Sequence, residues 1–244
     1  MHNGAVSDFL TIKRELCALM SDASYAQIQG GTDSEHLAAL YMTYLTQYQA
    51  NTDIDAFQQI YPLKDMLSAL QNTISTVMTL QQRTQGSDRQ PNSLNLCATD
   101  GVKLVATRFR NAIAEQPPSL YYSTTAGRVL NSKFPDHPNA SERTAGGQAG
   151  IEHGRHFIVA SEPSTYVEGE WEVVGKNCWV GCTSEGGVVG GRMEVVGLGE
   201  QEVGTVKDWE GWVPPISETA QGNEWVWEAR EGKYVCLEVE GQGE

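Results

Sequence analysis

The feature that most constrains the fold of this chain is a change in the spacing of its apolar residues. In the first part of the chain, apolar residues recur every three or four positions, the spacing of one face of an α-helix. From Leu94 onward they alternate with polar residues, as on a strand with one buried face. The two spacings in succession predict a mixed domain in which helices precede strands.

The first part of the chain predicts three helices. They are expected over residues 8–21, over residues 34–49, and from Pro62 to about residues 81–86. Ser7 is the expected N-cap of the first helix, because its hydroxyl can accept a backbone N–H. Thr32 and Glu35 have the capping-box spacing at the start of the second helix. Pro62 suits the first turn of the third.

The second part of the chain predicts short strands, two of them joined in a hairpin. Leu94–Ala98 and Val102–Phe109 flank Asp100-Gly101, a pair typical of type I′ hairpin turns, whose central residues need positive φ. Leu120–Ser123 and Phe157–Ser161 have the composition of two further short strands.

The composition predicts two regions. Residues 131–155 are rich in Pro, Gly, Asn, Ser and charge, and predict a long mobile loop inside a domain that covers residues 1–180. Residues 181–244 form an acidic tail of uncertain order, dominated by Gly, Glu and Val.

Charge and cysteine usage argue against several functions. The 244 residues carry a formal net charge of -14, which disfavours a nucleic-acid partner and an anionic membrane surface. The chain has neither an apolar run long enough to span a membrane nor a visible secretory signal. Five scattered cysteines argue against a disulfide framework. These features predict a cytoplasmic protein without nucleic-acid or membrane partners.

His2-Asn3-Gly4 is the first segment that can carry chemistry. An Asn-Gly pair is most often a simple turn. It can also form an oxyanion hole, in which the Asn3 amide and a nearby backbone N–H hold the negative charge of a tetrahedral intermediate. Gly4 would allow the backbone to approach closely. The candidate catalytic residues are therefore Asn3 and Gly4.

The second segment is Gly30–Glu35. Taken alone, Thr32 and Asp33 fit a helix cap. A carboxylate at a loop–helix junction can also bind the α-ammonium of an amino-acid ligand through a charge-assisted hydrogen bond. The two roles are compatible if Thr32 caps the helix and Asp33 points outward. Asp33 is therefore the candidate substrate-binding residue.

Several segments, taken in order, resemble the class II glutamine amidotransferases, which are N-terminal-nucleophile enzymes. The segments are Met1–Phe9, Thr32–Tyr41, Asn95–Gly101, Ala106–Arg110, Pro118–Ser123 and Ile158–Pro163. They are most similar to the branch that includes the fungal glutathione-degrading amidotransferase-like subunit. The ergothioneine-pathway γ-glutamyl hydrolases are similar but more distant. The resemblance covers about residues 1–180.

This resemblance implies an α+β fold, a four-layer αββα N-terminal-nucleophile hydrolase sandwich that is incomplete at the N-terminus. It implies that an N-terminal Cys, with its own α-amino group as base, hydrolyses a γ-glutamyl amide. Asn3 and Gly4 would form the oxyanion hole, and Asp33 would hold the substrate ammonium. The expected substrate is glutamine or a γ-glutamyl peptide such as glutathione, with other protein subunits as partners and no cofactor.

The chain departs from the family pattern at the nucleophile. Position 2 is His, no internal Cys carries a free amine, and the segment that precedes His-Asn-Gly in the family is missing. We therefore expect the chain alone to be inactive. The alternatives are a non-catalytic binding or scaffold subunit, a truncated gene model, and an unrelated soluble α/β domain.

Two other groups of residues are expected to carry no chemistry. Cys178 and Cys182 are four positions apart but have no second pair, so no metal site is expected. His153 and His156 lie in the predicted loop and are expected to be solvated.

Overall fold

The computed structural model describes residues 1–51, 53–86, 89–112, 114–127, 156–193 and 195, and the backbone of 226–230 and 233–237. The predicted loop at 131–155 and most of the tail at 181–244 lie outside the described residues. The chain forms two compact units. One comprises Met1–Pro118 with Gly175–Glu244, and the other comprises Ser119–Val174.

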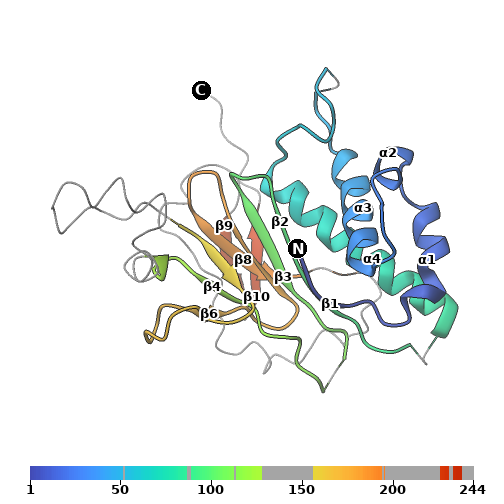
Figure 1. Cartoon of the computed structure of the whole chain (residues 1–244). Coiled ribbons are helices and arrows are strands. Elements are labelled where there is room, and N and C mark those ends of the chain that lie inside the picture. The colour runs from blue at the N-terminus through green and yellow to red at the C-terminus, as the bar shows by residue number, and fades with distance from the viewer. Residues whose placement is uncertain are drawn as a thin grey trace. The chain divides into compact units, whose positions relative to one another are not determined.

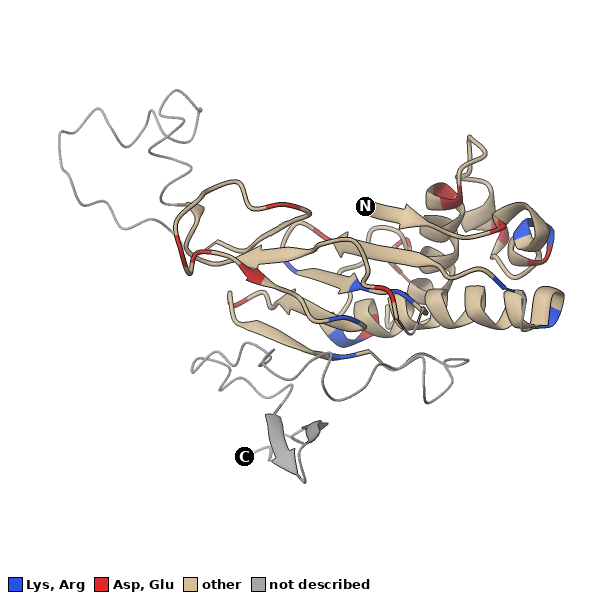
Figure 2. Ribbon diagram, turned by 90° about the horizontal axis from the view of Figure 1, so that it is seen from below, with Lys and Arg blue, Asp and Glu red and all other residues tan. Residues whose placement is uncertain are grey.

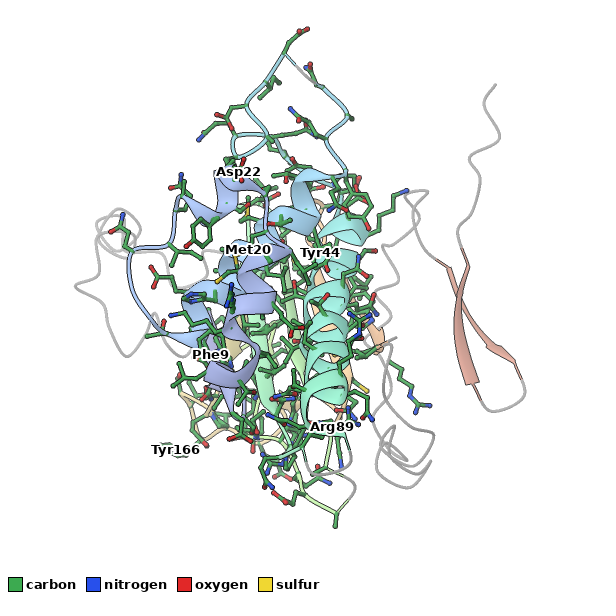
Figure 3. The ribbon with its side chains drawn as sticks, turned by 90° about the vertical axis from the view of Figure 1, so that its right-hand side faces the viewer. Phe9, Met20, Asp22, Tyr44, Arg89 and Tyr166 are labelled. Atoms are coloured by element: carbon green, nitrogen blue, oxygen red, sulfur yellow. The ribbon has the colours of Figure 1, made fainter. Side chains whose placement is uncertain are left out.

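The first unit begins with its helices. They are α1 (Phe9–Ala18), α2 (Asp22–Tyr25), α3 (Asp33–Thr46) and α4 (Leu63–Gln85). The three predicted helices are confirmed, whereas α2 has only four residues and no apolar stripe that could reveal it. In α4, Leu70, Ile74 and Val77 are buried at helical spacing. Figure 3 looks onto this helix layer and shows Tyr44, whose hydroxyl is 2.6 Å from the hydroxyl of Thr76 on α4.

The same unit holds an antiparallel sheet of five strands in the order β1-β2-β3-β7-β8. The strands are β1 (His2–Ala5), β2 (Ser93–Thr99), β3 (Leu104–Arg108), β7 (Cys178–Cys182) and β8 (Val188–Arg192). The start of the chain thus pairs with a strand that lies some ninety residues later, and β1 forms one edge of this sheet. The helices lie on one side of β1, β2 and β3 (Figure 1).

One face of the sheet packs on the helices. Leu94, Leu96 and Phe109 belong to the same buried apolar cluster as the helix side chains. Directly opposed residues of a ladder share a face, and neighbours along a strand lie on opposite faces. Because His2 lies opposite Leu96, it is on the helix-facing side, and Asn3 is on the other.

A buried polar network fixes the chain just after β1. The side chains of Gln81 and Asn92 are fully buried and hydrogen-bond each other, with Asn92 Nδ2 donating to Gln81 Oε1 at 2.6 Å. Gln81 Nε2 also donates to the carbonyl of Ser7 at 2.6 Å, and the Ser7 N–H donates to Asn92 Oδ1 at 2.9 Å. Leaving such a group unsatisfied costs about 1–3 kcal/mol, so the network restrains the connection from β1 to α1.

The second unit contains a three-stranded antiparallel sheet in the order β5-β4-β6. Its strands are β4 (Tyr121–Ser123), β5 (Ile158–Ala160) and β6 (Glu172–Val173), of which β4 and β5 were expected from the sequence. The Tyr122 hydroxyl donates to Glu172 at 2.6 Å. His156 is not simply solvated as expected, because its Nε2 accepts the N–H of Gly127 at 2.9 Å.

The β2–β3 hairpin is confirmed, but the predicted type I′ turn is wrong. Gly101 has a φ of +85°, whereas Asp100 is not in the left-handed region, so the two cannot be the centre of such a turn. The Asp100 N–H instead donates to the carbonyl of Lys103 at 3.3 Å. Gly101 and Val102 therefore form the tip, with the N–H of Val102 donating to the Asp100 carboxylate at 2.9 Å.

The prediction of Ser7 as the N-cap of α1 is also wrong. The N-cap is Asp8, at a φ of 48°, and it makes no side-chain capping bond. The Ser7 hydroxyl is used elsewhere, since it donates to the carbonyl of Pro91 at 2.6 Å. A long-range contact has therefore displaced a local capping preference.

The sheet continues past residue 180, into the segment for which the sequence predicts a tail of uncertain order. β8 pairs with β7 over its whole length. Neither strand has the alternation that marks a half-buried strand, because β7 is buried on both faces and β8 contains Gly190 and Gly191. Farther on, β9 (Val226–Arg230) and β10 (Lys233–Leu237) pair antiparallel.

Charged residues of the described part lie mainly on helices and loops. Figure 2 shows blue and red segments scattered over these elements, while most of the strand ribbon is tan. Within the described residues, no helix is long and apolar enough to cross a membrane. The helices and sheets described above confirm the mixed helix-and-sheet class. The four-layer arrangement stays a prediction.

Candidate functional site

Gly4 lies where only glycine fits. Its φ is +145°, outside the range that L side chains readily adopt. A Cβ at this position would lie 1.9 Å from the carbonyl oxygen of Ser93 on β2. Gly4 thus allows β1 to lie close to β2, and the approach of its backbone to an oxyanion stays a prediction.

The N–H of Gly4 faces the outer edge of the sheet. In an antiparallel ladder, alternate residues of a strand present their N–H and C=O groups to the same side. Met1 bonds towards β2, with its amino group 2.7 Å from the carbonyl of Cys97. Gly4, three residues after Met1, therefore presents its N–H to the opposite side, where the described residues contribute no further strand.

Asn3 is exposed and lies on the sheet face away from the helices. Its partner across the ladder is Asn95, whose side chain is buried. The Asn95 amide accepts the N–H of Phe109 at 3.2 Å and donates to the carbonyl of Pro118 at 2.9 Å. The neighbouring strand β2 is thus fixed by buried hydrogen bonds next to Asn3.

Asp33 is the first residue of α3, and Thr32 is its N-cap, as predicted. The Thr32 hydroxyl accepts the N–H of Glu35 at 3.3 Å. The Asp33 carboxylate points towards β1, where Oδ2 accepts the N–H of Val6 at 2.8 Å. Its other oxygen accepts the N–H of Ser34 at 2.7 Å. The Ser34 hydroxyl also donates to Oδ1, at 3.3 Å. An ionised carboxylate has about four acceptor positions, so these three bonds leave capacity for a ligand ammonium.

Two hydrogen bonds that the sequence did not predict join β1 to the first turn of α3. One is the bond from Val6 to Asp33 at 2.8 Å, and the other joins His2 Nδ1 to the hydroxyl of Ser34 at 2.8 Å. Val6 directly follows β1 and lies two residues after Gly4, so continued alternation turns both N–H groups to the same side. The structure therefore brings the Gly4 N–H and the Asp33 carboxylate to one edge of β1.

Glu35 does not complete the predicted capping box. In a capping box its carboxylate would reach back to the N–H of Thr32. Here it accepts the N–H of Gln29 at 2.7 Å and that of Gly30 at 2.8 Å. These backbone bonds lower the pKa of Glu35 and tie the preceding loop to the helix start.

Three of the described cysteines lack the features of an activated nucleophile. Cys97 is nearest to β1, and burial raises the pKa of its thiol against the smaller opposing effect of the Met1 amino group. Burial also raises the pKa of Cys178 to about 12, and it raises the pKa of Cys182. Thiols with raised pKa values are poor nucleophiles at neutral pH, because the reactive species is the thiolate.

Comparison with known proteins shows what the chain is similar to. No family model matches the chain. A curated relative, the "Probable glutamine amidotransferase DUG3" of Saccharomyces cerevisiae, is 32% identical over 181 residues, and the match covers 72% of this chain and 47% of the relative. The chain thus spans about half the length of that relative.

A solved structure, the glutamine aminotransferase class-II domain protein from Silicibacter pomeroyi, superposes with a TM-score of 0.54. The match covers 82% of this chain and 67% of that one at 20% identity, so it bears on the fold alone. The yeast relative agrees with the resemblance to the class II glutamine amidotransferases seen in the sequence, and the solved structure agrees with it in fold. The resemblance seen in the sequence is confirmed.

Proposed function

We propose that this chain supplies the oxyanion hole and the ammonium-binding carboxylate of a γ-glutamyl amide hydrolase. The observation that carries the proposal is the hydrogen bond from Val6 to Asp33, which places the carboxylate on the strand edge that also presents the Gly4 N–H. Two residues of a strand span roughly 7 Å. A γ-glutamyl group can bridge such a span, because three carbon atoms separate its ammonium from its side-chain carbonyl.

Each group has a separate task in the proposed reaction. The Asp33 carboxylate binds the substrate ammonium by a charge-assisted hydrogen bond. Attack of a cysteine thiolate on the side-chain carbonyl places negative charge on the carbonyl oxygen. The Asn3 amide and the Gly4 N–H stabilise that charge. The tetrahedral intermediate collapses, and the amine leaves with the proton that the cysteine thiol gave up, so that a thioester links the γ-glutamyl carbonyl to the cysteine sulfur. Water then hydrolyses the thioester, which releases glutamate and restores the thiol.

The nucleophile is the part that these 244 residues lack. Position 2 is His, and its ring is bonded to Ser34 on the helix-facing side of β1. We propose that the nucleophilic Cys comes from polypeptide that precedes Met1 in a longer protein, and that the chain alone does not hydrolyse amides. The yeast relative, of which the chain covers 47%, supports a longer protein.

The substrate and setting belong to the same proposal. Among γ-glutamyl amides we propose glutathione, on the resemblance of Asn95–Gly101 and Ile158–Pro163 to the glutathione-degrading branch. The protein would act with other subunits in the cytoplasm. The four described cysteines are free thiols, which fits a reducing compartment.

Ligand binding tests the Asp33 role without needing turnover. L-glutamine and glutathione are titrated into the 15N-labelled chain, and shifts of the Gly4, Val6 and Ser34 amides are followed by NMR. Asp33→Asn is expected to weaken binding about tenfold, because a hydrogen bond to a charged group is worth roughly 1.5–3 kcal/mol. Asp22→Asn is the matched control, since Asp22 also lies in a first helical turn.

The affinities of the original chain and the two variants decide whether Asp33 binds the ligand. Binding that Asp33→Asn weakens and Asp22→Asn does not supports the proposal. Equal affinity in all three proteins would remove Asp33 from the site. Release of glutamate from glutamine by the purified chain would overturn the proposed inactivity.

A non-catalytic binding subunit is the second candidate, and the His2–Ser34 bond favours it because it gives position 2 a structural role. Intact-mass analysis of the protein from its native source distinguishes the two. A Cys at the native N-terminus, upstream of Asn3, supports the hydrolase. A native chain that starts at Met1 or His2 supports the binding subunit.

A further inference from the structure

The end of β2 that extends past β1 is an open strand edge. Met1 and Cys97 exchange both backbone bonds, at 2.7 Å from the Met1 amino group and 2.9 Å from the Cys97 N–H. By strand alternation, Thr99 presents its N–H and C=O to this same side, where β1 has already stopped. No described residue pairs with Thr99 there. Thr99 is exposed and Ala98 only half-buried, whereas the strand is buried from Ser93 to Leu96.

A cavity of about 560 Å³ opens beside this edge, on the helix-facing side of the sheet. Its apolar walls come from α3, α4 and β2, and include Leu37, Tyr41, Met42, Leu70, Leu96 and Ala98. Burial raises the pKa of the Tyr41 hydroxyl and of the Cys97 thiol, as expected of groups in apolar surroundings. Apolar walls next to unpaired strand groups favour an extended polypeptide with an apolar side chain as the occupant.

We infer that the polypeptide preceding Met1 in the longer protein continues β1 along β2 and fills this cavity. In that register, the residue directly before Met1 lies opposite Ala98, and the one before it exchanges backbone bonds with Thr99. Side chains alternate between faces, so the residue directly before Met1 points into the cavity and is apolar. The inference rests on the proposed function in taking the preceding polypeptide as the occupant.

Met1 favours the preceding polypeptide over a separate peptide. Its backbone already has the direction and register of a strand beside β2. A covalent extension therefore orders only its own few residues, whereas a separate peptide also loses its translational and rotational freedom.

Two N-terminal extensions of identical composition test the inference. The first adds Lys-Val-Lys-Leu directly before Met1, which places Leu opposite Ala98 and a Lys opposite Thr99. The second adds Val-Lys-Leu-Lys, which reverses the alternation and points Lys at the cavity. The first is expected to raise the Tm about 4–8 °C above that of the second, as for burial of one Leu side chain in a domain of this size. It is also expected to slow hydrogen exchange of the Thr99 amide at least tenfold.

Each possible result either supports or overturns the inference that the preceding polypeptide fills the cavity. A higher Tm and a protected Thr99 amide in the first extension alone support the inference. Equal Tm values for the two extensions overturn it. Protection of Thr99 in the unextended chain that grows with protein concentration also overturns it, because a second copy would then be the occupant. These readouts need no substrate, so failure of γ-glutamyl binding leaves the result intact.

Discussion

At the scale of single residues, the site depends on backbone groups as much as on side chains. The Gly4 and Val6 N–H groups face one edge of β1, and the Asp33 carboxylate reaches that edge from another element. Gly4 and Asp33 were visible in the sequence as candidates. The contact that relates them runs through Val6, a residue without a functional side chain, so no motif could have revealed it.

Gly4 provides the first prediction. Gly4→Ala is expected to lower the free energy of unfolding by about 2–3 kcal/mol, because the new Cβ meets the Ser93 carbonyl and the backbone conformation is strained. Urea denaturation measures the loss. Gly31→Ala is the matched control, since its Cβ would have Lys13 Nζ as its nearest neighbour, at 4.0 Å. Equal stability in the two variants would mean that β1 does not lie against β2 in solution.

At the scale of elements, the loop before α3 is held by a carboxylate whose ionisation matters. Glu35 accepts two backbone N–H groups, and its folded pKa lies below the ordinary value of 4.5. A group with a lowered folded pKa stabilises the structure fully above its unfolded pKa. That stabilisation is lost as the pH falls through the folded pKa. The attachment of the loop to α3 is therefore sensitive to acid.

The expected outcome is a selective change at Gln29 and Gly30. Below pH 4.5 their amide signals should move towards unbonded positions in an NMR titration, as Glu35 takes up a proton. In Glu35→Gln this acid step should be absent, whereas Asp22→Asn should retain it. An acid step that persists in Glu35→Gln would assign the transition to another carboxyl group.

At the scale of the whole molecule, the charge of -14 is the dominant electrostatic property. Mutual repulsion of excess like charges destabilises a compact state, and salt screens it. Raising NaCl from about 10 to about 150 mM shortens the screening length from roughly 30 to 8 Å. The Tm should then rise by about 2–4 °C, equivalent to roughly 1 kcal/mol.

Calorimetric scans at each ionic strength measure this effect, and KCl should give the same shift because screening does not depend on the ion. A Tm that falls with salt would show that attractive pairs outweigh the repulsion. The Lys103–Asp100 pair, 2.7 Å apart and mostly buried, is an attractive pair of this kind.

Elements with local signals could be predicted from the sequence. The apolar stripe of α4, the Thr32 cap and the strands around Gly101 each follow from residues close together in the chain. Features that need partners far apart in the chain depend on long-range contacts and could not be predicted. The Ser7 hydroxyl donates to Pro91 instead of capping α1, β8 pairs with β7 although neither has alternating apolar residues, and the Val6 N–H connects the end of β1 to α3. The physical reason is that a periodic pattern shows which face is buried but does not specify which distant element covers it.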